Sequence, residues 1–234
     1  MSNLIPFAEN VWLLEGDEAH MYGVPFATRA VIIRLPDGKI WVHSPVALTP
    51  ERIGAVAALG PVSHLIEPNK IHSLYLADWR AEWPEATSWV SPRFAERHPD
   101  IEADLVLEDE APPAWLGTIE QQVIKGHKLL DEVWFCHKPS GSLIVTDLIQ
   151  KHDPQEQGFP WGLLKRVAGL LGKEGGTAID IRMTFEDKAL ARRCVEYVLD
   201  WEFDRLILSH GFCFETGGKD EVRKAMNWLL ETAQ

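Results

Sequence analysis

The sequence predicts an α/β fold in which two β-sheets are covered by outer helices. The first part of the chain is rich in short apolar runs typical of strands, and later segments mix strands with amphipathic helical patterns. The 234 residues show no repeat with a period of roughly 20 to 50 residues and no convincing internal boundary. Two sheets with outer helices is the simplest layering for this many strands, so we expect one domain over residues 1–234.

The composition is that of an ordinary globular protein, with 46% hydrophobic and 25% charged residues. The formal net charge of −12 argues against a nucleic-acid partner, because phosphate binding needs a cationic surface. No window approaches roughly 18 uninterrupted apolar residues, so we expect no transmembrane segment, and the start of the chain shows no signal peptide. Cys136, Cys194 and Cys213 form no CxxC pair, which favours free thiols in a cytoplasmic protein.

The first half of the chain predicts strands and helices bounded by clear turn residues. Pro36-Asp37-Gly38 predicts a hairpin between two of the strands. Thr49 and Pro50 are typical of a helix N-cap and first helical position. A second helix is expected from His72 to Trp83, where Pro84 stops it. The expected strands are 11–15, 30–35, 40–43, 62–66 and 88–91.

The second half begins with an acidic segment, 96–111, which we interpret as a solvated connector. Thr184 resembles the start of a capping box, and the last helix is expected over 219–232. The apolar segment 160–171 is interpreted as a lid or core-packed helix, with a membrane-surface helix or a homodimer contact as alternatives. The strands expected in this half are 119–124, 132–137, 142–146 and 205–209.

Four metal-ligand side chains follow four of these strands directly. They are His72, His127, Asp147 and His210. A single sheet edge would bring them together, and three imidazoles with one carboxylate suit Zn²⁺, Fe or Mn²⁺. A histidine at a strand end is also commonly a hydrogen-bonded structural residue, so the spacing alone leaves both interpretations open.

The stretch 67–79 reads as a strand end, a polar turn and a helix, which is where α/β proteins place ligand-binding side chains. Asn69 and Lys70 in this turn are candidate substrate-binding residues. Lys70 could instead pair with Asp147 and make an ion unnecessary, or simply face solvent. His137 is a further candidate for substrate binding, with turn capping as its alternative. His43-Ser44 lacks a Gly-x-Ser-x-Gly elbow, which argues against a serine hydrolase.

The joint order of motifs resembles the metallo-β-lactamase superfamily. The motifs are the strand and polar turn before His72, then Lys125-Gly126-His127, Leu143-Ile144-Val145-Thr146-Asp147 and Leu206-Ile207-Leu208-Ser209-His210-Gly211. The chain resembles a domain-of-unknown-function family with that fold more closely. The segments that carry this resemblance are Trp41-Val42-His43-Ser44-Pro45, Pro68-Asn69, Asp109-Glu110-Ala111-Pro112-Pro113-Ala114-Trp115 and His137-Lys138-Pro139-Ser140. The resemblance implies a four-layer αββα sandwich with a site along one edge of the two sheets.

The resemblance also shows a departure. Asn69-Lys70-Ile71-His72-Ser73-Leu74-Tyr75 stands where the superfamily has His-x-His-x-Asp-His. His127 matches the Gly-His motif, Asp147 the bridging aspartate and His210 the final histidine. The resemblance therefore implies a degenerate active site: a metal-dependent hydrolase relative with a mononuclear centre of His72, His127, Asp147 and His210, in which Asp147 and His72 are catalytic.

The expected substrate is a small-molecule ester, thioester or phosphoester. The alternative is a non-catalytic protein that keeps the fold, binds no metal and holds a small ligand in a Trp-lined pocket.

Overall fold

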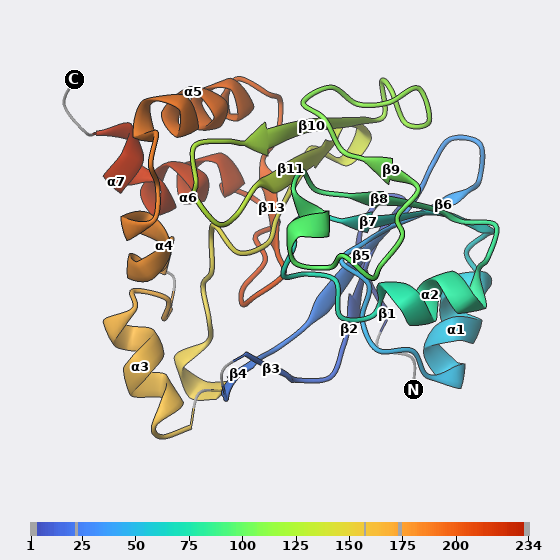
Figure 1. The fold of residues 1–234 in the computed structure, drawn as a ribbon, viewed down its shortest axis with the longest axis horizontal. Helices are drawn as coiled ribbons and strands as arrows, with labels where there is room; N and C mark the ends of the chain where they lie inside the picture. The colour runs from blue at the N-terminus through green and yellow to red at the C-terminus, as the bar shows by residue number, and fades with distance from the viewer. Residues whose placement is uncertain (1–3, 22, 157, 173–174, 232–234) are drawn as a thin grey trace.

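The strands of the protein form two main sheets. The structure is a computed structural model that describes residues 4–21, 23–156, 158–172 and 175–231 (Figure 1). The larger sheet has the order β1 (Leu4–Ala8), β2 (Val11–Glu15), β5 (Arg29–Arg34), β6 (Ile40–His43), β7 (Val62–Glu67), β8 (Thr87–Val90), β9 (Leu105–Val106). The smaller sheet has the order β10 (Ile119–Ile124), β11 (Glu132–His137), β12 (Ser142–Val145), β13 (Arg205–Leu208). A separate hairpin joins β3 (Ala19–Met21) and β4 (Val24–Phe26).

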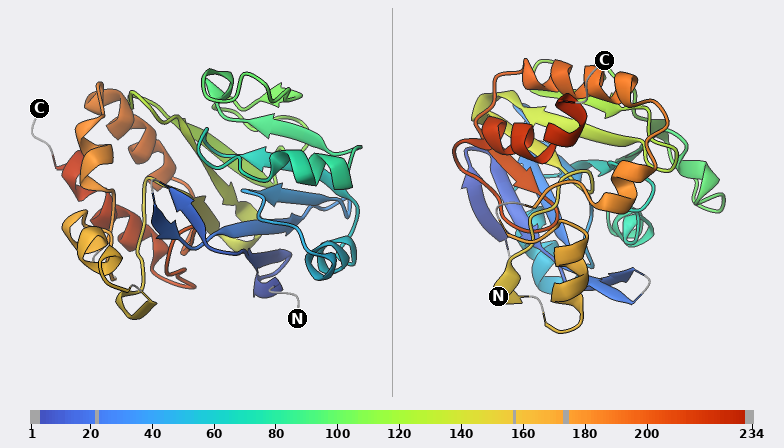
Figure 2. Two further views of the ribbon diagram at one scale, coloured as in Figure 1. Left: turned by 60° about the horizontal axis from the view of Figure 1, so that its bottom comes forward. Right: turned by 90° about the vertical axis from the view of Figure 1, so that its left-hand side faces the viewer.

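Helices cover the outer face of each sheet, which gives the expected four-layer αββα sandwich (Figures 1 and 2). Helices α1 (Pro50–Ala57) and α2 (Leu76–Glu82) pack on the larger sheet through a core that contains Val56 and Trp79. Helices α5 (Lys188–Leu199), α6 (Gly218–Ala225) and α7 (Asn227–Leu230) cover the smaller sheet. A third core, with Trp41 and Phe135, fills the space between the sheets. Each sheet thus buries both faces.

Several predicted boundaries are wrong for identifiable reasons. The acidic connector contains a short strand, because Leu105 and Val106 pair in parallel with β8. Helix α5 begins at Lys188, where the Asp187 side chain accepts from Leu190 N–H. Thr184 instead ends a short helix, α4 (Ile179–Met183), which the sequence did not indicate. The predicted last helix is divided at Met226, and residue 232 lies outside the described residues.

The topology brings several strand ends to the same edge of the sandwich. Strands β6 and β7 run parallel in one sheet, and β12 and β13 run parallel in the other. Pro68 C=O accepts from Val133 N–H at 2.8 Å, which joins the turn after β7 to β11 of the opposite sheet. Segments that leave β6, β7, β12 and β13 therefore meet, although they belong to different sheets.

The β3–β4 hairpin and helix α3 (Trp161–Val167) lie together at one end of the molecule (Figure 1). Lys165 Nζ donates to Pro25 C=O at 2.7 Å and lies over the Phe26 ring. Helix α3 thus packs on the hairpin with a buried lysine, while Leu163, Leu164 and Val167 stay exposed. Within the described part of the chain, every helix is too short or too polar to cross a membrane.

Candidate metal centre

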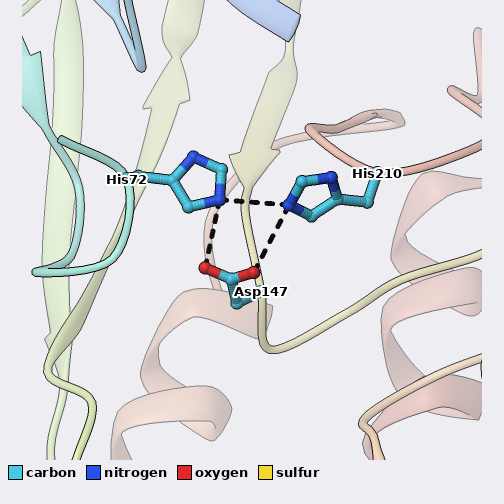
Figure 3. A group of neighbouring side chains, drawn as sticks. All are labelled: His72, Asp147 and His210. Carbon is cyan, nitrogen blue, oxygen red and sulfur yellow. Dashed lines mark hydrogen bonds and ion pairs between the residues drawn. The ribbon is translucent and has the colours of Figure 1, made fainter. Parts of the chain in front are cut away.

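Three of the predicted ligands converge at the shared edge (Figure 3). His72 Nε2 lies 3.1 Å from Asp147 Oδ2, and His210 Nε2 lies 3.4 Å from Asp147 Oδ1. The two Nε2 atoms are 3.1 Å apart. Asp147 and His210 are buried and the His72 side chain is 11% exposed, so the structure places two imidazoles and one carboxylate around a common point with little solvent contact.

Asn69 holds the His72 turn in place and ties it to Asp147. Its Oδ1 accepts from the N–H groups of Ile71 and His72, an Asx-type turn that directs His72 toward the opposite sheet. Its Nδ2 donates to Asp147 Oδ2 at 2.8 Å and to Thr146 Oγ1 at 3.0 Å. Asn69 is fully buried, so these bonds satisfy an amide that would otherwise be costly to desolvate. Asn69, predicted as a substrate-binding residue, therefore organises the site from within.

The outer nitrogen of each imidazole also has a partner. Ser44 Oγ lies 2.6 Å from His72 Nδ1, and Ala27 C=O lies 2.8 Å from His210 Nδ1. A carbonyl can only accept, so His210 carries its proton on Nδ1 and, when neutral, presents the bare Nε2 lone pair to the centre. Such outer partners are typical of metal-ligating histidines, because they fix ring orientation and tautomer.

Glu132 lies opposite Asp147 across the β11–β12 hairpin and orders the Asp147 loop. It is fully buried, and its carboxylate accepts from the N–H groups of Thr146, Asp147 and Leu148 at 3.0, 2.7 and 3.0 Å. Trp134 Nε1 donates to it at 2.9 Å, and Asn69 Nδ2 approaches at 3.4 Å. A group that faces only donors serves as a carboxylate, so Glu132 holds the backbone that carries Asp147.

The electrostatics of the three central groups follow from burial and proximity. Burial alone would lower the pKa of His72, but the charge and hydrogen bond of Asp147, with a contribution from Glu132, raise it above its ordinary value. Burial would raise the pKa of Asp147, but His72 and His210 lower it well below its usual range. Burial, followed by the Asp147 charge, raises the pKa of Glu132. Asp147 is thus an anion that requires positive charge or hydrogen-bond donors beside it.

The spacing of the three groups fits a small divalent cation. Tetrahedral zinc with bonds of about 2.0–2.1 Å places neighbouring ligand atoms about 3.3 Å apart. The three inner contacts are 3.1, 3.1 and 3.4 Å, and with a single oxygen from Asp147 the three ligand atoms lie within 4.8 Å of one another. Three protein ligands leave a fourth coordination position free, as in catalytic zinc sites.

His127 is not brought into this group, contrary to the expectation of four converging ligands. Its Nδ1 accepts from Leu129 N–H and Leu130 N–H at 3.0 and 2.7 Å. Its Nε2 lies 2.7 Å from Thr184 Oγ1 and 3.2 Å from Ile181 C=O. Nδ1 thus closes the loop after β10, and Nε2 joins that loop to α4, so both ring nitrogens have structural roles.

Lys70 and His137 also lie away from the centre. Lys70 Nζ pairs with Glu96 Oε2 at 3.0 Å, so the lysine does not occupy the metal position or pair with Asp147. His137 pairs with Ser142 at the start of β12, at the far end of that strand from Asp147, and its Nδ1 lies 2.8 Å from Ser140 Oγ. The turn-capping alternative for His137 is therefore the contact that the structure shows.

The sequence reasoning missed three residues of the site. Glu132 was read only as the first residue of a strand, although a carboxylate opposite Asp147 in a hairpin register was a detectable signal. Gln150 Nε2 donates to Asp147 C=O at 3.3 Å and approaches Oδ1 at 3.5 Å, and nothing in the sequence indicated this role. Ser44 was considered with His43, whereas its partner is His72.

Comparison with known proteins agrees with this fold. Residues 8–157 match the family described as a domain of unknown function, DUF4336. No curated protein matches the chain. Similar solved structures include a metallo-β-lactamase from Pontibacter korlensis (11% identity, TM-score 0.66, 99% of this chain and 100% of that chain covered).

Two further structures have related folds. The metallo-β-lactamase FIM-1 from Pseudomonas aeruginosa in its mono-zinc form has 13% identity and a TM-score of 0.63, with 98% of this chain and 96% of that chain covered. The metal-soaked Flv1 flavodiiron core from Synechocystis sp. PCC6803 has 12% identity and a TM-score of 0.65, with 98% and 61% covered. At these identities the likeness establishes a metallo-β-lactamase fold and nothing more specific.

Proposed function

We propose, from the premise that this chain belongs to the DUF4336 family and has a metallo-β-lactamase fold, that it is a hydrolase with one divalent metal ion. His72, Asp147 and His210 would hold the ion. The observation that carries the proposal is the convergence of their three ligand atoms. Asp147 and His210 are buried, and each of the three side chains has a supporting partner, Ser44, Asn69 or Ala27. When bound, Zn²⁺, Fe or Mn²⁺ would supply Lewis-acid activation of water and of the scissile group.

The surroundings of Asp147 favour one ion rather than two. Asn69 Nδ2 donates to Oδ2 of this carboxylate at 2.8 Å, so this oxygen already uses one lone pair within the protein. Asn69 also stands in the degenerate first motif, and both nitrogens of His127 have protein partners. Asp147 would combine ligation with orientation of water, and His72 would be a ligand beside it.

The proposed substrate class is a small-molecule ester, thioester or phosphoester, since these bonds are cleaved by metal-activated water. The placement of Lys70 against Glu96 speaks against the alternative in which a lysine replaces the ion. Trp79, Trp115 and Trp134 are buried in the cores, which speaks against a ligand pocket lined by these residues.

Three further assignments are proposals of the same kind. The three cysteines are free, which supports a cytoplasmic location. The exposed apolar side chains of α3 offer a surface for a homodimer. A single metallo-β-lactamase structure matches 99% of this chain, which supports a single domain over residues 1–234.

The proposal is tested by metal analysis of protein purified without a histidine tag, together with assays on generic ester, thioester and phosphodiester substrates. We expect one ion per chain and turnover that a chelator abolishes. Asp147→Asn should lose both, whereas Asp109→Asn, at a partly exposed aspartate paired with Lys125, should keep both. A parent protein with neither ion nor turnover would instead favour the non-catalytic ligand-binding alternative.

A further inference from the structure

The two histidines of the centre are supported by chemically different groups. His210 Nδ1 faces a backbone carbonyl, Ala27 C=O, which can only accept a hydrogen bond. His72 Nδ1 faces the hydroxyl of Ser44, which can donate or accept. His210 is therefore fixed in one tautomer, with Nε2 bare when neutral, while His72 is free to adopt either.

We propose that Ser44 is a positioning residue whose hydroxyl reverses its hydrogen bond when the centre binds a metal ion. The reversal allows neutral His72 to be an Nε2–H donor without the ion and an Nε2 ligand with it. The inference rests on the proposed function, because it concerns the same centre, but it assigns a role to a residue outside the ligand set.

The arrangement without an ion follows from the groups that His72 Nε2 faces. His210 Nε2 and Asp147 Oδ2, both 3.1 Å away, present lone pairs. A third lone pair from His72 would be repelled by both, so the proton of the neutral ring lies on Nε2. Nδ1 is then bare, and the Ser44 hydroxyl must donate to it across 2.6 Å.

The arrangement with an ion requires the opposite tautomer. His72 Nε2 must present its lone pair to the cation, so the proton lies on Nδ1 and donates to Ser44 Oγ. The ring gains and loses no proton overall, since one N–H replaces the other. A carbonyl in place of Ser44 would stabilise only this second state, whereas an apolar group would leave Nδ1 unpaired in both.

The backbone conformation at Ser44 favours glycine, which indicates that the serine hydroxyl has a role. Ser44 has φ +53°, a left-handed conformation that favours glycine over serine at a cost of roughly 1 kcal/mol. Its N–H donates to Ile66 C=O at 2.8 Å, which anchors the turn to β7. Glycine would fit this backbone better, so the side chain is kept against a conformational preference.

The test compares Ser44→Gly, which removes the hydroxyl and suits the positive φ, with Ser91→Gly as the matched control. Ser91 is also buried at the end of a strand, and its Oγ has no hydrogen-bond partner among the described residues. We expect Ser44→Gly to bind Zn²⁺ about 10- to 100-fold more weakly in a chelator competition, and Ser91→Gly to match the parent. Ser44→Ala serves as a second hydroxyl-free variant. Equal affinity of Ser44→Gly and the parent would overturn the inference.

A second readout does not depend on metal affinity or activity. Long-range ¹H–¹⁵N NMR of the zinc-free parent, at a pH where His72 is neutral, should show the His72 proton on Nε2, and the zinc-bound parent should show it on Nδ1. An Nδ1–H tautomer without zinc would refute the role of Ser44 even if the protein binds zinc. If the parent binds no zinc, the proposed function and the reversal both fail. If the parent binds zinc but His72 shows the same tautomer with and without the ion, only the reversal fails.

Discussion

Replacing Glu132 by glutamine should destabilise the protein severely although the two side chains have nearly the same shape. The carboxylate receives two hydrogen bonds on Oε1, from Trp134 Nε1 and Thr146 N–H, and two on Oε2, from Asp147 N–H and Leu148 N–H. A glutamine keeps one oxygen and turns the other into an NH₂ group that faces two donors. Either orientation of the amide therefore loses at least two bonds, and the orientation with NH₂ at the Oε2 position also loses the approach of Asn69 Nδ2.

The magnitude follows from these lost contacts. A hydrogen bond to a charged group contributes about 1.5–3 kcal/mol, so two of them amount to about 3–6 kcal/mol. This is a large share of the roughly 5–15 kcal/mol by which domains are stable. Because the same N–H groups shape the Asp147 loop, the zinc affinity of the folded variant should fall as well.

Urea denaturation followed by tryptophan fluorescence measures this effect. Glu120→Gln is the matched control, because Glu120 forms only a partly exposed ion pair with Lys138, and its loss should cost under about 1 kcal/mol. A Glu132→Gln variant within about 1 kcal/mol of the parent would show that the carboxylate does not hold the loop by charge-assisted bonds.

Three further changes test separate features. Burial, aided by the charge of His72, lowers the pKa of His43 to about 3. Between pH 6.5 and about 3 only the unfolded chain therefore takes up this proton, so the free energy of unfolding should fall by about 1.4 kcal/mol for each unit by which the pH is lowered. His43→Leu should flatten that part of the pH profile measured by urea denaturation. Lys70→Met should leave zinc affinity within about twofold of the parent, because Lys70 pairs with exposed Glu96; a large gain would restore the idea that the lysine competes with the ion. His127→Gln should lower the free energy of unfolding by about 1–3 kcal/mol while one ion per chain is retained, and loss of the ion would return His127 to the ligand set.

The sequence was a good guide to the elements and to the convergence of three of the four predicted ligand side chains. Asp147 and His210 follow neighbouring parallel strands, β12 and β13, so strand-end reasoning placed them together correctly. His72 was predicted at the junction of a polar turn and a helix that begins at His72. The structure has the turn, but α2 begins only at Leu76.

His127 was misplaced because the turn before it is not decided by local sequence. Gly126 has φ +90°, and its C=O accepts from Glu186 N–H and Asp187 N–H at 2.9 and 3.0 Å. These long-range bonds draw the loop against the start of α5 and direct the imidazole to α4. Such contacts depend on packing between distant segments and leave no local pattern.

The centre is divided between the two halves of the sandwich. Ser44 and His72 extend from the larger sheet, and Asp147 and His210 extend from the smaller one, so the two imidazoles that meet at 3.1 Å are 138 positions apart in the chain. A cation at that point would cross-link the two sheets. Removal of the ion should destabilise both sheets at once. We expect amide hydrogen exchange to become faster first in β7 and β13.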